Sequence, residues 1–266
     1  METGLKNKRV VITGATAGIG RGIAHCFADE GSQLAICGRT INPLESVRQE
    51  CEQKGAQVTA IQADMTKAAE VEHFIMASQA AMGGIDVLVN CVGGVDQLLP
   101  FEELNDDDWQ NIWELNVMSA VRVTRAALPI MKPNGWGRII NIASESGIQP
   151  DPFMPHYNAV KAALITFTKS MSKALAGDGI MVNTVSPAMT RNDDVDNFIK
   201  QRAEQDNSSL LEAEQALMRD LRPNIVLGRP GEPEEVGAAV VFLASEQASF
   251  ITGTNLRADG GSVASI

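Results

Sequence analysis

Short apolar runs alternate with helical stretches along nearly the whole chain, and this alternation restricts the fold more than any other feature. The runs are mostly continuous, as in "RVVITG" and "QLAICG". Continuous runs are typical of strands buried on both faces, and strand–helix alternation favours parallel pairing. We therefore predict an α/β protein with a doubly wound parallel sheet and helices on both faces. Seven strands are expected, at residues 9–14, 33–38, 57–64, 86–94, 137–144, 180–187 and 254–261.

Helical spacing fills the stretches between the apolar runs. Pro43 lies early in one stretch and Gly55 at its end, an arrangement that helix termini favour. The predicted helices span residues 18–31, 42–55, 67–84, 106–131, 155–176 and 233–245.

The segment 188–227 breaks this rhythm. It is acidic, rich in Gln and Asn, and has only patchy helical spacing. Insertions of this length in a compact domain tend to be functional or mobile. Since the chain shows no internal repeat and no linker-like stretch, we predict a single domain over residues 1–266, with 188–227 as a substrate lid within it.

The composition argues against several classes of function. A net charge of −11 is unlike that of a nucleic-acid-binding protein. The three histidines are isolated and the cysteines are scattered, so we expect no metal site and reduced thiols in a cytoplasmic protein. The N-terminus lacks a signal-peptide pattern, and no apolar run approaches the ~18 residues of a membrane span. The cysteines are Cys26, Cys37, Cys51 and Cys91.

Three glycines lie between the first predicted strand and the first predicted helix. In "VVITGATAGIGRGIA" these are Gly14, Gly18 and Gly20. In doubly wound folds this turn presents backbone N–H groups and a helix N-terminus to a pyrophosphate. Glycine allows close approach because it has no Cβ. The placement predicts a nucleotide site, although the spacing TGxxxGxG differs from GxGxxG.

The end of the second predicted strand carries Gly38 and Arg39. An acidic residue at this point would accept the ribose 2′-OH of NAD, whereas a guanidinium suits the 2′-phosphate of NADP. We therefore expect NADP(H) as the preferred cofactor, with NAD(H) possible. A solvated arginine at a strand end is the simpler alternative.

The only tyrosine of the chain, Tyr157, precedes Lys161 by four residues in "PHYNAVKAAL". Residues four apart lie on one face of a helix. A phenol is a poor base at neutral pH, and a nearby positive charge lowers its pKa. The pair therefore fits a general acid/base. The alternative is an ordinary surface tyrosine beside a lysine.

Taken together, these segments resemble the short-chain dehydrogenase/reductase family, in its single-domain Rossmann-type branch and nearest to 3-oxoacyl-[acyl-carrier-protein] reductases. The likeness covers nearly the whole chain. It rests on "TGATAGIG" at 13–20, "AD" at 63–64, "NCVGG" at 90–94, "LNV" at 115–117, "IASESG" at 142–147, "YNAVK" at 157–161, "VNTVSPAMT" at 182–190 and "ITGTNLRADGG" at 251–261.

The resemblance implies a catalytic tetrad of Asn116, Ser144, Tyr157 and Lys161. Tyr157 would transfer a proton to or from the substrate oxygen, and Lys161 would lower its pKa and bond the nicotinamide ribose. Ser144 would polarise the carbonyl. Asn116 would kink its helix and hold a water that links Lys161 to solvent.

Three positions depart from the family pattern. Cys91 and Val92 replace Asn and Ala in the motif after the fourth strand, and Ala188 replaces the glycine after Pro187. These are changes near the cofactor and none touches the tetrad, so we expect nucleotide binding to survive.

The resemblance also implies a set of binding residues. The expected cofactor contacts are Gly14, Thr16, Gly18, Ile19, Gly20, Arg39, Asp64, Met65, Asn90, Val92, Gly93, Tyr157, Lys161, Pro187, Ala188, Met189 and Thr190. The substrate candidates are Ser146, Gln149, Phe153, Met154, Met189 and Phe198.

The expected reaction is reduction of a ketone, 3-oxoacyl-like and possibly carrier-bound, to a secondary alcohol. The alternatives are an NAD-dependent dehydrogenase of a sugar, steroid or diol, a non-catalytic NADP-binding sensor, and an isomerase or dehydratase. The resemblance further implies a homotetramer or homodimer, in which the helices 106–131 and 155–176 would pack against partner copies. Candidate subunit contacts are Val121, Ala127, Ala163 and Phe167.

Overall fold

The computed structural model describes residues 2–95 and 97–265. Within these ranges, seven strands form one sheet in the order β3-β2-β1-β4-β5-β6-β7, and every neighbouring pair is parallel. The predicted fold class is therefore confirmed. The strands are β1 (Arg9–Ile12), β2 (Gln33–Gly38), β3 (Gln57–Gln62), β4 (Val87–Asn90), β5 (Gly137–Ile142), β6 (Ile180–Pro187) and β7 (Asn255–Ala258).

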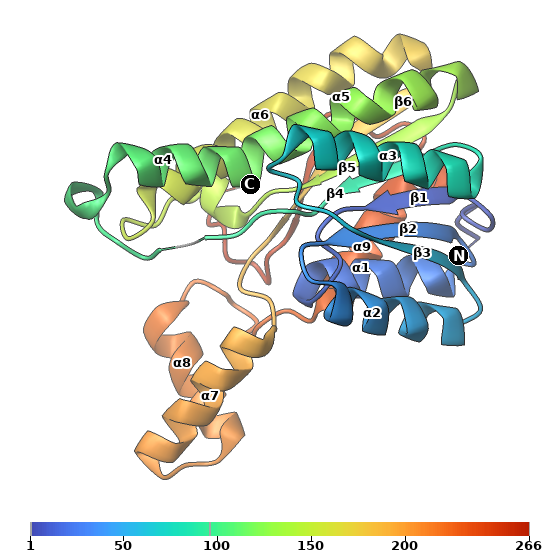
Figure 1. Ribbon diagram of the computed structural model, residues 1–266. Helices are drawn as coiled ribbons and strands as arrows, with labels where there is room; N and C mark the ends of the chain where they lie inside the picture. The colour runs from blue at the N-terminus through green and yellow to red at the C-terminus, as the bar shows by residue number, and fades with distance from the viewer. Residues whose placement is uncertain (1, 96, 266) are drawn as a thin grey trace.

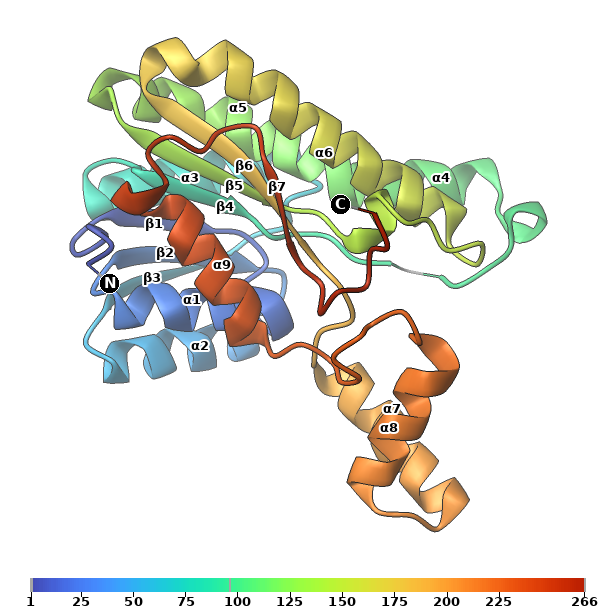
Figure 2. The same ribbon diagram turned by 180° about the vertical axis from the view of Figure 1, so that it is seen from behind.

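Helices cover both faces of the sheet, as Figures 1 and 2 show. One layer consists of α1 (Gly18–Asp29), α2 (Ile41–Gln53) and α9 (Pro233–Ala244). The other consists of α3 (Ala68–Met82), α5 (Ser119–Met131) and α6 (Pro155–Leu175). Each layer has its own hydrophobic core against the sheet, with Phe27 fully buried in the first and Phe74 in the second.

The strand order reverses between β1 and β4. From β1 the chain runs outward to β2 and β3, then returns to β4 and continues to β7. Loops that leave the carboxyl ends of β1 and β4 therefore diverge, and in open α/β sheets the crevice between such loops is where ligands bind.

The predicted helix 106–131 is divided into three parts. α4 (Asp106–Trp113) begins with a capping box between Asn105 and Asp108. A π-helical turn, η2 (Glu114–Met118), follows, and α5 begins at Ser119. Ala127 on α5 is 0% exposed and belongs to the core beneath the sheet. The expectation that Ala127 contacts a partner copy is therefore wrong.

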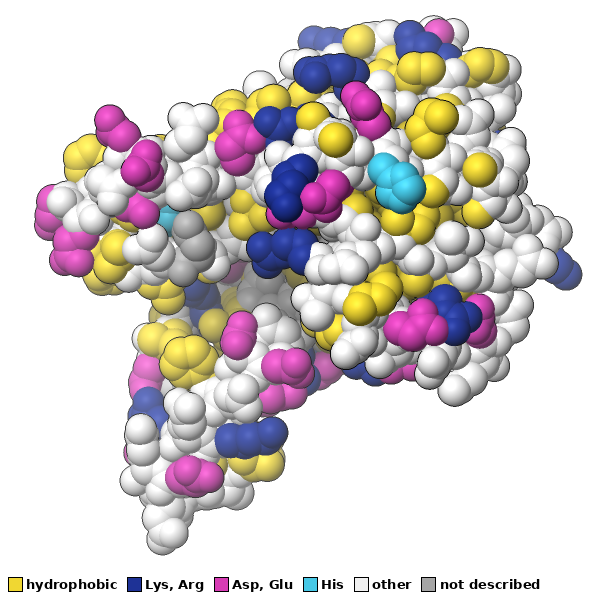
Figure 3. All heavy atoms as spheres, viewed as in Figure 1, with side chains coloured by type: hydrophobic (Ala, Val, Ile, Leu, Met, Phe, Trp, Pro, Cys, Tyr) yellow, Lys and Arg dark blue, Asp and Glu magenta, His cyan; other side chains and the backbone are white. Residues whose placement is uncertain are grey.

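The segment 188–227 contains two helices, α7 (Asp193–Asp206) and α8 (Leu210–Leu221). They pack against each other through a small cluster around Ile199 and Leu217. In Figures 1 and 2 the pair projects away from the sheet. Figure 3 shows hydrophobic side chains on the surface of this projection. Its apolar surface includes Leu211, which is 64% exposed.

The start of this helix pair is tied to the body around Arg191. Arg191 N donates to Gly231 O at 2.8 Å, and Gly231 N donates to Met189 O at 3.0 Å. The Arg191 guanidinium also binds Glu232, at the start of α9, at 3.0 Å. These contacts join the two ends of the segment.

Among the described residues, no helix is long and apolar enough to cross a membrane.

Candidate active site

A cavity of about 510 Å³ opens at the carboxyl ends of β1, β4, β5 and β6. We refer to it as the central cavity. The loops after these strands, the first turns of α6 and the base of α7 all contribute to its wall. Its lining brings together the glycine loop, Ser144, Tyr157 and Lys161, which are far apart in the sequence.

The loop between β1 and α1 presents backbone atoms to the central cavity. Gly14 and Gly18 have φ values of 69° and 49°, which side chains disfavour. A Cβ on Gly20 would lie 2.0 Å from Gly14 O, so only glycine allows the first turn of α1 to pack against this loop. Ala17 at the N-cap provides no side-chain acceptor for the first N–H groups of α1. This helix terminus fits a phosphate group.

Asn116 and Lys161 meet beside Gly93. A Cβ on Gly93 would lie 2.6 Å from Asn116 Oδ1 and 3.0 Å from Lys161 Nζ. Gly94 N donates to Asn116 Oδ1 at 3.0 Å, and Asn116 Nδ2 donates to Gly94 O at 3.0 Å. The side chain of Asn116 therefore holds the loop after β4 in a fixed position next to the lysine.

The π-helical turn explains how Asn116 reaches this loop. A π-helical turn disturbs the regular ladder of i→i−4 hydrogen bonds. Asn116 Nδ2 donates to Ile112 O at 3.1 Å, so a side-chain donor supplements the backbone at this turn. Asn116 is 0% exposed. The departure from a regular helix that the resemblance implied thus takes the form of a π turn.

The pKa of the Tyr157 phenol differs from our expectation. Burial raises the pKa of Tyr157 from 10.0 to about 12, although a hydrogen bond with Ser144 acts in the opposite direction. Lys161 Nζ lies 5.4 Å from the centre of the tyrosine ring. The pKa of the phenol therefore lies above its ordinary value, because loss of solvation of the phenolate outweighs the hydrogen bond with Ser144. The lowering of this pKa by Lys161 stays a prediction.

Lys161 is itself deeply buried, with an exposed fraction of 3%. Its Nζ donates to Ile142 O at 3.1 Å. Burial lowers the pKa of Lys161 from 10.5 to about 8, and Cys91 acts in the opposite direction. At neutral pH the site therefore contains a protonated phenol beside a mostly protonated amine, an arrangement suited to donating a proton.

The chain is similar in sequence to known oxidoreductases. Residues 14–263 match a family model described as Enoyl-(Acyl carrier protein) reductase. The chain is 36% identical over 269 residues to a Bacillus subtilis protein named as an uncharacterized oxidoreductase, with 100% of each covered. It is 34% identical to the 3-oxoacyl-[acyl-carrier-protein] reductase of Aquifex aeolicus, over 98% of this chain and 99% of that one.

A solved structure agrees over the full length. The L-sorbose reductase of Gluconobacter frateurii, complexed with NADPH and L-sorbose, matches with a TM-score of 0.93 and 32% identity over 100% of both chains. The chain belongs to the short-chain dehydrogenase/reductase family. The resemblance inferred from its motifs is confirmed. The protein is an oxidoreductase of a family that uses NAD or NADP.

In this short-chain dehydrogenase/reductase, the expected cofactor residues divide among three cavities and the core. Thr16 lines a second cavity, and Arg39 and Asp64 line a third. Eleven others line the central cavity: Gly14, Gly18, Ile19, Gly20, Gly93, Tyr157, Lys161, Pro187, Ala188, Met189 and Thr190.

Three expected cofactor residues are not part of the cavity walls. Met65 is 2% exposed and lies in the core. Asn90 is buried and donates to Asn141 Oδ1 at 2.8 Å. Val92 packs against the core, and its N and Cα lie within 3.2 Å of a Cβ built on Gly14. These residues support the loops that line the site.

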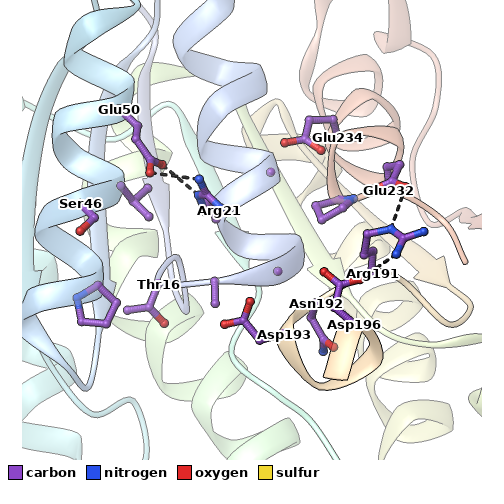
Figure 4. A pocket seen from close by; sticks show the side chains of 16 residues that line it. Thr16, Arg21, Ser46, Glu50, Arg191, Asn192, Asp193, Asp196, Glu232 and Glu234 are labelled. Atoms are coloured by element: carbon purple, nitrogen blue, oxygen red, sulfur yellow. Dashed lines mark hydrogen bonds and ion pairs between the residues drawn. The ribbon is translucent and has the colours of Figure 1, made fainter. Parts of the chain in front are cut away.

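The second cavity, of about 470 Å³, adjoins the glycine loop and is shown in Figure 4. It lies between α1, α2 and the starts of α7 and α9. Arg21 on one side binds Glu50 at 2.9 Å, and Arg191 on the other binds Asp196 at 2.7 Å. Because carboxylates already bind both guanidinium groups, this cavity is a poor site for an anion.

The third cavity, of about 300 Å³, contains cations that are more accessible. Arg39 is exposed, and Lys67 lies beside it in the cavity lining. Lys67 Nζ approaches Glu70 at 3.1 Å, and Asp64 Oδ1 accepts a bond from Thr66 Oγ1 at 2.8 Å. Of the second and third cavities, the third is the better match for a 2′-phosphate.

Only some of the predicted substrate residues line the central cavity. Ser146, Met154 and Met189 line the central cavity. Gln149 does not, because its Nε2 donates to Ser262 O at 3.2 Å and its Oε1 accepts from Ala264 N at 3.1 Å. Gln149 thus holds the C-terminal segment in place. Phe153 and Phe198 are 61% and 59% exposed and are not part of the cavity lining. Phe198 lies on α7, and this helix projects from the body (Figure 1).

Four charged residues of the central cavity were missed in the sequence: Glu145, Arg191, Asp194 and Arg222. Glu145 directly follows Ser144, and Arg222 follows the end of α8. Glu145 is 7% exposed although it is an acid. Glu145 could have been found from the sequence, because it is an acidic residue in a motif at the end of a buried strand. Nothing in the sequence indicated that Arg222 reaches the site.

Proposed function

We propose that this protein reduces a ketone to a secondary alcohol with NADPH, with Tyr157 as the proton donor. The observation that supports this most is the shared central cavity, in which Ser144, Tyr157 and Lys161 face the glycine loop. Nucleotide binding and proton transfer would thus take place within one enclosure. A sensor that only binds a nucleotide would not need a phenol and an amine at that position.

The glycines of this chain fit a dinucleotide. Gly14, Gly18 and Gly20 would hold the pyrophosphate at the start of α1, where a Cβ on Gly20 would collide with Gly14 O. Gly93 leaves the space beside Lys161 free for the nicotinamide ribose. When bound, the cofactor supplies a hydride to the carbonyl carbon.

The residues of the chain would complete the reaction by moving a proton. Tyr157 Oη donates its proton to the carbonyl oxygen, so the C=O group becomes CH–OH and a phenolate remains. Ser144 would hydrogen-bond the same oxygen and stabilise the charge that develops on it. Lys161 would bind the nicotinamide ribose, and Asn116 would hold a water through which the phenolate regains a proton from solvent. The phenol of Tyr157, with a pKa of about 12, is protonated at neutral pH and can therefore act as the donor in this direction.

The preference for NADP(H) over NAD(H) rests on Arg39. Its side chain lies at the end of β2, exposed and beside Lys67 in the third cavity. A guanidinium binds a phosphate through two parallel charge-assisted hydrogen bonds. We include in the proposal that residues 1–266 form one domain, that 188–227 is a substrate lid, and that the protein assembles as a homotetramer or homodimer.

Ser144 and Tyr157 do not by themselves select one class of ketone. A 3-oxoacyl thioester and a ketose both carry a ketone, and the relatives described above are named for each of these. Ser144 and Tyr157 would handle either carbonyl in the same way, so any preference must come from the rest of the cavity wall.

Tyr157→Phe tests the proposal. Tight binding of NADPH, measured by the fluorescence of the nucleotide, is expected to persist, while ketone-dependent oxidation of NADPH falls at least ~100-fold, since general acid catalysis contributes on that scale. Thr166→Val, an exposed substitution on the same helix, is the control and is expected to retain activity. Loss of NADPH binding together with turnover would contradict the role of Tyr157 as the acid.

A further inference from the structure

One carboxylate oxygen in the wall of the central cavity has no partner. Glu145 lines this cavity directly after Ser144 and is 7% exposed. Its Oε2 atom is buried and has no hydrogen-bond partner among the described residues. Leaving a buried polar atom unpaired is unfavourable, and for a charged group the penalty is larger. An unpaired acceptor in a substrate cavity therefore indicates a ligand that donates.

The surroundings of Glu145 disfavour the ionised form of its carboxyl group. Burial raises the pKa of Glu145, while a hydrogen bond with Ser262 and the charge of Arg222 act in the opposite direction. Asp259 and Asp151 add negative charge nearby. Oε2 has no hydrogen-bond partner among the described residues, so a donor supplied by a ligand would lower the remaining penalty.

A purely structural role for Glu145 does not account for this atom. Ser262, the neighbour from the C-terminal segment, is already held by Asn224 Nδ2, which approaches its Oγ at 2.5 Å. Gln149 holds the same segment through Ser262 O and Ala264 N. The segment thus has its own supports, and the orientation of Glu145 next to Ser144 leaves one oxygen in surplus.

We propose that Glu145 accepts a hydrogen bond from a hydroxyl group of the substrate next to the reacting carbon, and that the substrate is a small polyhydroxylated ketone or the matching polyol. This inference rests on the proposed ketone reduction and specifies its substrate class. The reacting carbonyl would bind at Ser144 and Tyr157, and Glu145 would bind the hydroxyl one position along the chain.

The other polar groups near Glu145 are compatible with a hydroxyl donor. Arg222 lines the same cavity and forms an ion pair with Asp151 at 3.1 Å. A hydroxyl satisfies a carboxylate oxygen without introducing a second charge, and it can accept in turn from Arg222.

An unsubstituted acyl chain fits this wall less well. It would leave the buried Oε2 without a partner, whereas a hydroxyl group would supply one. Ser146 and Asn192 add further polar groups to the same lining. Sites built to hydrogen-bond a substrate hydroxyl discriminate strongly against analogues that lack it.

The test compares two ketones that share a four-carbon skeleton, 2-butanone and erythrulose, which differ by three hydroxyl groups. Each is reduced with NADPH by the full chain. We expect kcat/KM for erythrulose to exceed that for 2-butanone by about 100-fold or more. In Glu145→Gln this ratio should fall by about 10-fold or more, mainly through KM, because the amide is a weaker acceptor than a carboxylate. Glu145→Leu should reduce it further.

Glu102→Gln is the matched control, since Glu102 is exposed and does not line the central cavity. It is expected to leave the ratio unchanged. A ratio in Glu145→Gln equal to that of the unmodified protein, or a preference of the unmodified protein for 2-butanone, would overturn the assignment of Glu145. Oxidation of NADPH by either ketone would leave the proposed reduction standing.

A binding measurement covers the case in which neither ketone is reduced. Erythritol, the polyol that corresponds to erythrulose, is titrated by calorimetry into the protein saturated with NADP⁺. Binding to the unmodified protein that weakens about 10-fold or more in Glu145→Gln supports the inference independently of turnover. No binding to the unmodified protein would contradict the polyhydroxylated class, whereas failure of a broad ketone panel to oxidise NADPH would contradict the proposed function.

Discussion

Burial sets the direction of the pKa shifts of Tyr157 and Lys161, the two residues on which the proposed proton transfer depends. From the sequence, Tyr157 and Lys161 formed a pair on one helix face, and their spacing was sufficient to predict that they lie together. The direction of the phenol pKa was not predictable from spacing, because it depends on solvation of the phenolate by the folded chain. A high phenol pKa and a depressed lysine pKa both follow from the same enclosure.

The pH dependence of ketone reduction should report Lys161. Its ammonium is present below a pKa of about 8 and is lost as the pH rises through that value. With the ammonium needed to bind the nicotinamide ribose, kcat/KM for reduction is expected to be level up to about pH 7.5. Above pH 8 it should fall about tenfold per unit. Lys161→Arg keeps the charge at high pH and should abolish the fall in the activity that it retains. A profile level to pH 10 would show that the ammonium is not required.

Arg39 is the residue through which cofactor preference is tested. Arg39→Asp should lower kcat/KM for NADPH relative to NADH by about 100-fold, because charge-assisted bonds to the 2′-phosphate are replaced by repulsion. Arg125→Asp, at an exposed arginine of α5, is the control. An unchanged ratio of the two cofactors would transfer the role to another cation of the third cavity, Lys67.

At the scale of elements, the sequence indicated most helices and strands but not the π turn within 106–131. The apolar spacing continues through this stretch, so periodicity alone predicts one helix. The interruption depends on Asn116, whose amide binds Ile112 O and Gly94, and the second of these contacts comes from a loop after another strand. A contact between distant segments is not encoded in local periodicity.

One arginine at the base of the helix pair α7–α8 binds three carboxylates. Arg191 binds Asp196 on α7, Glu214 on α8 and Glu232 at the start of α9. Of the three carboxylates, Glu214 is the least exposed, with a side-chain exposure of 15%. This network links both lid helices to the body.

Arg191→Met should loosen the lid without unfolding the sheet. We expect limited proteolysis within 188–232 to accelerate about tenfold, since Arg191 forms three ion pairs and each pair of this kind contributes about 0.2–1 kcal/mol. Arg202→Met is the matched control, because Arg202 binds only Asp206 and Asp220 within the helix pair. Equal cleavage rates for the two variants would show that the base of the lid is held by its backbone bonds instead.

At the scale of the whole molecule, the order of the motifs predicted the sheet, its parallel pairing and the convergence of the tetrad. Those features follow from strand–helix alternation, which the fold converts into one edge with all carboxyl ends together. The position of the lid helices, and hence the exposure of Phe198, was not predictable, because packing between distant surfaces sets it. The same holds for Glu145, whose unpaired oxygen becomes apparent only when its neighbours are known.

An exposed phenylalanine on the surface allows the proposed tetramer or dimer to be tested. Phe250, shortly before the edge strand β7, is fully exposed at 102%. Burying a phenylalanine side chain is worth about 1.5–3 kcal/mol, so a partner copy that covers it would gain appreciably. We expect the unmodified protein to elute with the mass of a tetramer or dimer in size-exclusion chromatography with light scattering.

Phe250→Glu should shift that assembly toward a smaller species at micromolar concentration, because a charge would then be buried at the contact. Met76→Glu is the control, since Met76 is 66% exposed on α3, in the layer that packs against α5. A lower mass in both variants would indicate a general loss of stability, which thermal unfolding would reveal. An unchanged mass in Phe250→Glu with a multimeric unmodified protein would place the contact on another surface, for which the half-buried residues Val121, Ala163 and Phe167 of α5 and α6 are the next positions to substitute.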